Sequence, residues 1–175
     1  MTEVLVDRRI DQPHTDAEIQ QLLDDSADCR DIYRLDRHRS LLSADRRQLI
    51  CHLSSPDLES VRRALKTQGP LTADVWSCTL RDAPGLTNEE LAQANVWASW
   101  RFEIPVAIEE LESIDPSGSV CLRTHRVRLL RAFISTDRRR VSCLCQAADA
   151  ESVRLALRES KWPVERVWSF RQFLP

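Results

Sequence analysis

Several features are scarce in this sequence, and each scarcity excludes a class of protein. No apolar run approaches the roughly 20 residues that a membrane helix needs. Residues 1–11 carry charges where a secretory signal peptide needs an apolar stretch. Only three glycines occur, at positions 69, 85 and 118, and they form no glycine-rich phosphate loop. We therefore expect a cytoplasmic protein with no membrane partner.

Cysteine spacing and charge exclude two further classes. The six cysteines contain no C-x-x-C pair, so neither a zinc ribbon nor a thioredoxin-type motif is present. The net charge of −2 provides no general attraction for nucleic acid. Small α+β domains that bind RNA carry exposed aromatic residues on their third strand. The segments expected to form such strands here, QLICHL (48–53) and RVSCLC (140–145), contain no aromatic residue, so we expect no nucleic-acid partner.

The sequence does contain an internal repeat. DLESVRRAL at 57–65 returns as DAESVRLAL at 149–157, an offset of 92 residues, and the match continues without a gap across 4–80. Two copies of this length indicate a tandem duplication of a small domain. The predicted organisation is repeat 1 at 1–82, a linker with a short helix at 83–95, and repeat 2 at 96–175.

Each copy is predicted to have the element order βαββαβ. Alternating apolar residues and turn signals predict strands at 4–10, 31–43, 48–53 and 73–80, and at 96–102, 121–134, 140–146 and 164–171. A capping box at Thr15 and Glu18 starts the first helix, and a second box at Thr87 and Glu90 lies in the linker. Ser55-Pro56 is the expected start of the next helix, and Pro105 of its equivalent in repeat 2.

The predicted sheets have two apolar faces. A βαββαβ unit places both helices on one face of an antiparallel sheet, so the other face should be polar if water covers it. It instead carries Ile50, Trp76, Leu144 and Trp168. The predicted fold is therefore α+β, with two tandem ferredoxin-like domains packed sheet-to-sheet as a pseudo-dimeric α+β barrel with an internal cleft. A monomeric pseudo-dimer and a homodimer both remain open.

Three segments resemble a known family. VDR (6–8), RSLLS (39–43) and ICHLSSPDLESVR (50–62) resemble the small nickel-binding ferredoxin-like proteins, a family of unknown function. The resemblance extends more weakly to the second copy and implies a fused dimer in which nickel is a candidate cofactor. Arg39 and Arg131 stand where the family often has histidine, and a guanidinium cannot ligate a metal, so no metal ligand is assigned.

Candidate site residues follow from the side chains expected in the cleft. Asp7, Tyr33 and His52 are the acid–base candidates. His52 has Leu144 as its counterpart, so any site would be asymmetric. Arginines that can clamp a carboxylate or phosphate, and two tryptophans, are the ligand-binding candidates. These are Arg9, Arg37, Arg39, Trp76, Arg101, Arg131 and Trp168.

Two cysteines share one face of a predicted strand. Cys143 and Cys145 are two residues apart, which makes them a candidate soft clamp for a metal. We expect them instead to be core thiols facing the helices, because free cysteine is commonly buried.

Three functional classes fit these features. The first is a protein that binds a small-molecule ligand or a metal ion, nickel among them, in the cleft. The second is a cofactor-independent enzyme of the dimeric α+β barrel type, a monooxygenase, isomerase or cyclase acting on a small anionic substrate. The third is a protein-interaction module. Fold alone does not separate these classes.

Overall fold

The computed structural model describes residues 1–67, 73–107, 110, 120–160 and 164–175. It has a mixed α/β fold with eight strands in antiparallel pairings. The chain forms two compact units. Unit 1 comprises Met1–Cys78 and Arg171–Pro175, and unit 2 comprises Thr79–Phe170. Among the described helices, none combines the length and hydropathy needed to cross a bilayer.

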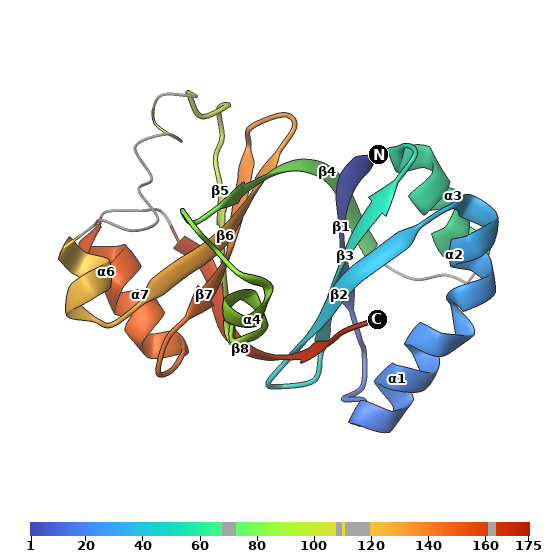
Figure 1. Cartoon of the computed structure of the whole chain (residues 1–175), viewed down its shortest axis with the longest axis horizontal. Coiled ribbons are helices and arrows are strands. Elements are labelled where there is room, and N and C mark those ends of the chain that lie inside the picture. Colours follow the sequence, from blue (N-terminus) through green and yellow to red (C-terminus); the bar gives the residue numbers. More distant parts are fainter. Residues whose placement is uncertain (68–72, 108–109, 111–119, 161–163) are drawn as a thin grey trace. The chain divides into compact units, whose positions relative to one another are not determined.

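Unit 1 is a sheet with helices on one face (Figure 1). Its elements are β1 (Thr2–Arg9), α1 (Asp16–Asp25), α2 (Ala27–Tyr33), β2 (Asp36–Ser43), β3 (Gln48–Ser55), α3 (Leu58–Thr67) and the first part of β4 (Ala73–Asp82). The strand order is β4-β1-β3-β2, and the end of β8 lies beside β2.

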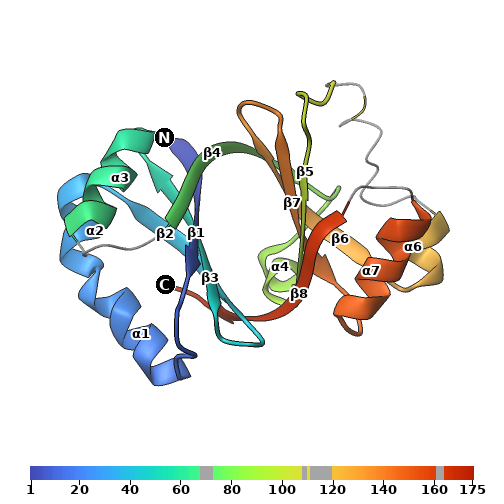
Figure 2. The ribbon, with the colours of Figure 1, turned by 180° about the vertical axis from the view of Figure 1, so that it is seen from behind.

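Unit 2 repeats this plan, with α6 and α7 on one face of its sheet (Figure 2). Its elements are α4 (Asn88–Ala92), β5 (Val96–Arg101), α6 (Val120–Thr124), β6 (Arg128–Ser135), β7 (Arg140–Gln146), α7 (Ala150–Glu159) and most of β8 (Val164–Phe173). The order is β8-β5-β7-β6, with the end of β4 beside β6. The compact units thus differ from the sequence repeats, because β4 and β8 each begin in one unit and end in the other.

Strand pairings in the two units match at the offset of 92 residues. Val4 lies opposite Leu53 in unit 1, and Val96 lies opposite Cys145 in unit 2. A β-bulge also recurs. In unit 1 the β2–β3 register shifts between Arg37 and Arg39, and in unit 2 the β6–β7 register shifts between positions 129 and 131. The origin of this likeness in a gene duplication stays a prediction from the sequence.

The predicted strands at 31–43 and 121–134 start too early. The segment before β2 is helical up to Tyr33, and Arg34 then ends α2 in the left-handed conformation, with a φ of 55°. Arg126 has a φ of 53° and separates α6 from β6 in the same way. The left-handed conformation is usual for glycine and rare for other residues. Because arginine occupies both positions, no glycine or proline in the sequence marks either turn.

Helix starts agree with the sequence in two of three cases. The capping boxes at Thr15 and Thr87 are confirmed, and the second opens α4. The start predicted at Ser55-Pro56 is wrong, because the N-cap of α3 is Asp57, whose carboxylate accepts the Ser60 N–H at 2.7 Å. Asp149 caps α7 in the same way through the Ser152 N–H. The helix predicted after Pro105 lies mostly outside the described residues.

The helix-side faces form the two hydrophobic cores. Leu49, Cys51 and Leu53 point into the core of unit 1. Cys143 and Cys145 lie in the core of unit 2, which confirms their prediction as core thiols. That two sheets cover each other with their other faces stays a prediction.

Candidate functional site

A polar cluster lies on the helix-free face of unit 1. Its members are Glu3 on β1, His38 on β2 and His52 on β3, called here the histidine–glutamate cluster. Antiparallel pairing brings them together, because Leu5 lies opposite His52 and Glu3 lies opposite Ser54, the next residue of β3 on the same face. The nitrogen and oxygen atoms that these three residues offer to a metal all lie within 4.8 Å of one another.

Hydrogen bonds connect the cluster through Ser54. The distance from His52 Nε2 to Glu3 Oε2 is 2.6 Å, and the Ser54 hydroxyl donates to Glu3 Oε1 at 3.0 Å. His38 Nε2 lies 2.6 Å from Ser54 Oγ. Because the Ser54 proton is directed to Glu3, its oxygen accepts from His38, which therefore carries its proton on Nε2. An ionised Glu3 accepts from His52 Nε2 in the same way.

The two imidazoles differ in their access to solvent. His52 is 2% exposed, whereas the side chain of His38 is 34% exposed and that of Glu3 is 27% exposed. The rings lie 4.7 Å apart between centroids, with an angle of 48° between their planes. One imidazole is thus buried and hydrogen-bonded to Glu3 while the other borders on water, an arrangement that a ligand could reach from one side.

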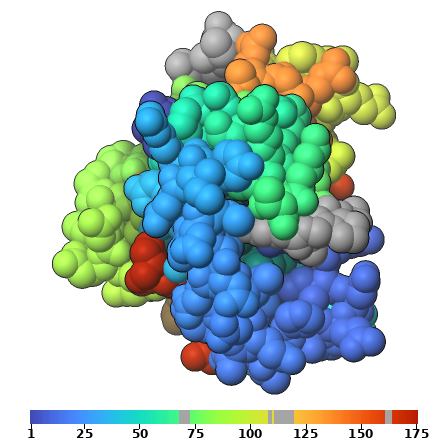
Figure 3. All heavy atoms as spheres, turned by 90° about the vertical axis from the view of Figure 1, so that its right-hand side faces the viewer, coloured from blue at the N-terminus to red at the C-terminus, as the bar shows by residue number. Residues whose placement is uncertain are grey.

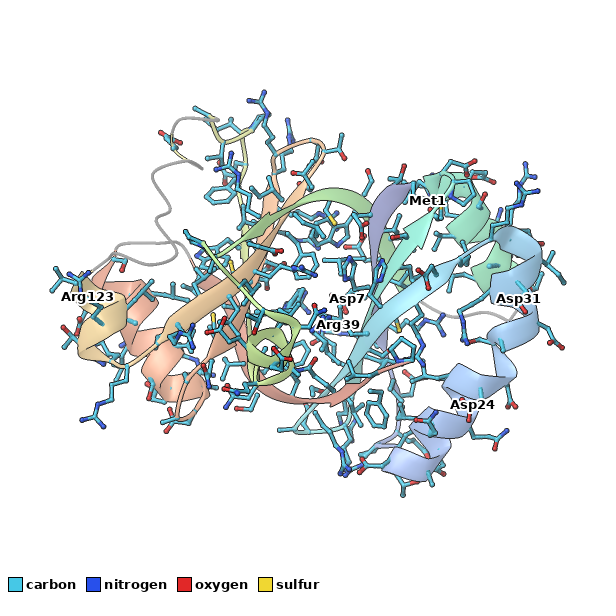
Figure 4. All side chains as sticks on the ribbon, viewed as in Figure 1. Met1, Asp7, Asp24, Asp31, Arg39 and Arg123 are labelled. Carbon is cyan, nitrogen blue, oxygen red and sulfur yellow. The ribbon has the colours of Figure 1, made fainter. Side chains whose placement is uncertain are left out.

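Arg39 lies beside this cluster. It sits opposite His52 in the β2–β3 pairing, is 8% exposed, and donates to Gln172 Oε1 at 3.1 Å. Trp76 faces the same side, because it lies opposite Leu5 on β4. Figure 4 shows Asp7 and Arg39 on the side of the sheet turned away from the helices. This face of the sheet therefore carries metal-ligand atoms with a positive charge beside them and an aromatic residue on β4.

Two predicted site residues lie on the wrong face. Arg37 was expected with Asp7, but it lies opposite Leu53 on the helix side, because the β-bulge at His38 reverses the alternation between Arg37 and Arg39. Tyr33 was expected on the same side as Asp7. It lies at the end of α2 and packs against the helix-side core.

Asp7 shares the correct face but is used elsewhere. Its carboxylate accepts a hydrogen bond from Gln48 Nε2 at 2.7 Å, and it lies opposite Ile50, two residues from His52 along β3. Of the polar site residues predicted in unit 1, the structure therefore joins only His52 and Arg39 to the candidate site.

The remaining predicted arginines are Arg9 in unit 1 and Arg101 and Arg131 in unit 2. Arg9 is exposed, and Arg101 is exposed with Glu165 at 3.6 Å. Arg131 donates two hydrogen bonds to the carboxylate of Asp82, at 2.5 and 2.8 Å.

Unit 2 carries aromatic side chains on the corresponding face. Trp97 lies 5.7 Å from Phe133 and 6.1 Å from Trp168 between ring centroids, and Trp168 meets Phe170 edge-on at 6.2 Å. The positions 92 residues after the cluster are Asn95, Leu130 and Leu144, so unit 2 has no equivalent cluster.

The two buried cysteines on β7, Cys143 and Cys145, are unsuited to metal binding or nucleophilic chemistry. Burial raises the pKa of Cys145 to about 12, and it raises the pKa of Cys143 with a further contribution from Cys145. Both thiols therefore stay protonated at neutral pH, whereas a metal ligand or nucleophile must be a thiolate.

The sequence alone missed Glu3 and His38. Glu3 shares a strand face with Leu5 and Asp7, so its face could be predicted, but its distance from His52 depends on the β1–β3 register. The side of the sheet on which His38 lies depends on the bulge, and no glycine or proline in the sequence indicates that bulge.

Comparisons with known proteins gave only distant structural similarities. No family model and no curated protein matches the chain. A structure designated a monooxygenase, from Fusobacterium nucleatum, has 11% identity and a TM-score of 0.46, covering 98% of this chain and 91% of the other. A structure designated a chlorite dismutase has 13% identity and a TM-score of 0.46, with 98% and 94% covered. An anthrone oxidase-like protein has 9% identity and a TM-score of 0.45, with 99% and 93% covered.

Proposed function

We propose that this protein binds a divalent transition-metal ion at the histidine–glutamate cluster. The observation that carries this is the convergence of one carboxylate and two imidazoles, from three neighbouring strands, within 4.8 Å. Nitrogen and oxygen ligands of this kind suit Zn²⁺, Ni²⁺, Co²⁺ and Cu²⁺. Nickel is the first ion to test, because the sequence resembles a nickel-binding family and the strand order of each unit supports a ferredoxin-like unit.

Metal binding would rearrange the protons of the cluster. Both Nε2 atoms carry protons when they donate to Ser54 and Glu3, and each must present a lone pair to an ion. A neutral ring therefore moves its proton to Nδ1, and a doubly protonated ring must release one proton, so affinity falls as the pH falls. Ser54 can keep donating to Glu3 Oε1, which would hold the carboxylate in place around the ion.

Three protein ligands leave room for a further molecule. A tetrahedral ion held by Glu3, His38 and His52 has one more position for water or an anion. Arg39, opposite His52, could neutralise the charge of an anion bound there. A metal ion and a small anionic ligand, which the sequence offered as alternatives, would then bind together at one site.

Calorimetric titration of the chelator-treated full chain tests this proposal. We expect one Ni²⁺ or Zn²⁺ per chain, and a measured heat that varies with the ionisation enthalpy of the buffer because binding displaces protons into it. His38→Leu and His52→Leu, which introduce the residues that unit 2 has at these positions, should abolish the binding. Unchanged stoichiometry and affinity in both variants would contradict it.

A second candidate is acid–base catalysis without a metal. The 2.6 Å hydrogen bond from buried His52 to Glu3 is a carboxylate–imidazole pair that can accept a proton from a substrate, and Arg39 could bind an anionic group. This corresponds to the enzyme of the dimeric α+β barrel type. It predicts that a small anionic aromatic compound, benzoate for instance, stabilises metal-free protein, and that Arg39→Gln removes the effect. Stabilisation by metal alone would contradict this candidate.

A further inference from the structure

A second polar site lies on the opposite side of the unit 1 sheet, beneath the helices. A small cavity of about 30 Å³ is bordered by side chains of α1, α2, α3 and three strands. Most of its lining is apolar, but three arginines border it: Arg8 from β1, Arg30 from α2 and Arg37 from β2. We call this the arginine pocket. Figure 3 shows the side of the molecule that covers it, with α1 and α2 in blue and α3 in green.

Arg37 is the most deeply placed of the three. It is 7% exposed and donates to the carbonyl oxygens of Phe173 and Leu174, at 3.1 and 3.2 Å. A guanidinium has five N–H groups, so these two bonds leave three available. Its Nε atom is buried and makes no hydrogen bond with the residues that the structure describes. A buried charged donor without an acceptor is costly unless a ligand or water supplies one.

Two of the three arginines, Arg30 and Arg37, make their hydrogen bonds to neutral acceptors. Arg30 donates to the carbonyl of Leu23 and to the Ser26 hydroxyl, both neutral acceptors. Among the described residues, no carboxylate lies within ion-pair distance of Arg30 or Arg37. Burial lowers the pKa of Arg37, and the charge of Arg30 lowers it further, while Cys51 and then Asp24 act more weakly in the opposite direction. An anion would relieve this repulsion.

The corresponding positions of unit 2 show that the fold does not require these arginines. Ninety-two residues later, Arg8, Arg30 and Arg37 correspond to Trp100, Leu122 and Leu129. All three are buried in the core of unit 2. Since a well-packed apolar core is often at least as stable as a buried charge, the buried Arg37 is expected to cost stability, whereas Arg8 and Arg30 are half-buried. A binding role accounts for their presence.

We propose that the arginine pocket binds the carboxylate group of a small aliphatic acid. The cavity has room for about two water-sized groups, which suits a carboxylate head better than a phosphate. The Nε–H and one terminal N–H of Arg37 form a fork that matches the two carboxylate oxygens. Leu22, Leu65 and Val61 provide an apolar wall for a short hydrocarbon tail. The site lies on the other face of the sheet from the histidine–glutamate cluster and is independent of it.

Thermal melting with acetate and propionate, against chloride and inorganic phosphate at equal ionic strength, tests this inference on the full chain. We expect a saturable rise in the melting temperature of the wild type with the carboxylates only. Arg37→Leu should fold with a melting temperature at or above that of the ligand-free wild type, and should lose the response. Arg62→Leu removes an exposed arginine of α3 and should respond as the wild type does.

Two further measurements keep the test decisive. Arg37→Lys retains the charge but loses the fork, so it should weaken carboxylate binding by at least about tenfold. In the wild type, the Arg37 Nε–H resonance should shift when propionate is added. An equal response to chloride or phosphate, an unchanged response in Arg37→Leu, or an unmoved Nε–H resonance would each overturn the proposal.

Discussion

Replacement of His38 by glutamine should separate metal binding from folding. The side chain of His38 is 34% exposed, and glutamine can still donate to Ser54, so the variant should fold. It removes one of the three ligand atoms of the histidine–glutamate cluster. Because disturbing a residue that only orients a ligand already costs about 10–100-fold in metal affinity, loss of a ligand should cost at least about 100-fold.

This loss converts into a measurable change in stability. At a metal concentration of about 100 times the wild-type Kd, binding adds about 2.7 kcal/mol to the free energy of unfolding. With a 100-fold larger Kd the same concentration adds only about 0.4 kcal/mol. For a chain of this size, these values correspond to shifts of the melting temperature of about 5–11 °C and about 1–2 °C.

Circular dichroism melts with and without Ni²⁺ provide the assay, after treatment with a chelator that is then removed. His14→Gln is the matched control, because His14 is also accessible but lies outside the cluster, where its Nδ1 contacts the Gln12 carbonyl. Equal metal-induced shifts in wild type and His38→Gln would refute the assignment of His38 as a ligand. A shift lost in His14→Gln would place the metal elsewhere.

Three other outcomes test the fold. Asp82→Asn should lower the free energy of unfolding, measured by urea denaturation, by about 1 kcal/mol, because it disrupts the two hydrogen bonds to Arg131. The effect stays modest because the Asp82 side chain is 44% exposed. Asp149→Ala should lower the melting temperature at neutral pH. The difference should vanish in acid, because the Ser152 N–H lowers the pKa of this carboxyl in the fold, and its stabilisation is lost as pH falls through that value. Alkylation of the folded protein near pH 8, read by mass spectrometry, should modify only the two cysteines that are not buried, since thiolates form poorly in a core. These are Cys29 and Cys121.

Local chemistry predicted the parts of the fold that depend on neighbouring residues. The alternation of Leu49, Cys51 and Leu53 identified the helix-side face of β3, since side chains of a strand alternate between faces. The capping boxes at Thr15 and Thr87 needed only a hydroxyl and a glutamate three residues apart. Features of this kind can be read from a single sequence.

The parts that failed depend on backbone geometry between distant segments. The bulge between Arg37 and Arg39 inserts one residue into β2. The face predicted for the residues of β2 before the bulge, Arg37 among them, is therefore reversed. Arg34 ends α2 in a conformation that is usual for glycine. Because no glycine marks the end of this helix, the sequence pattern did not predict the helix that contains Tyr33. The candidate site needs the β1–β3 register as well, and no local signal fixes a register between strands 50 residues apart.

The two units differ in the polar residues that could bind a ligand or an ion. At six positions of unit 1 that contribute to the histidine–glutamate cluster or the arginine pocket, unit 2 has an apolar residue or an amide at an offset of 92. The pairs are Glu3 and Asn95, His38 and Leu130, His52 and Leu144, Arg8 and Trp100, Arg30 and Leu122, and Arg37 and Leu129. Buried polar groups cost stability that apolar residues of similar size would supply. Of the six unit 1 residues, His52 and Arg37 are buried and bear this cost, whereas five of the unit 2 counterparts are buried and apolar. Replacing His52 and Arg37 by leucine, their unit 2 counterpart, should therefore raise stability as it removes binding, and a variant that lost stability and kept binding would show that these polar residues serve the fold instead.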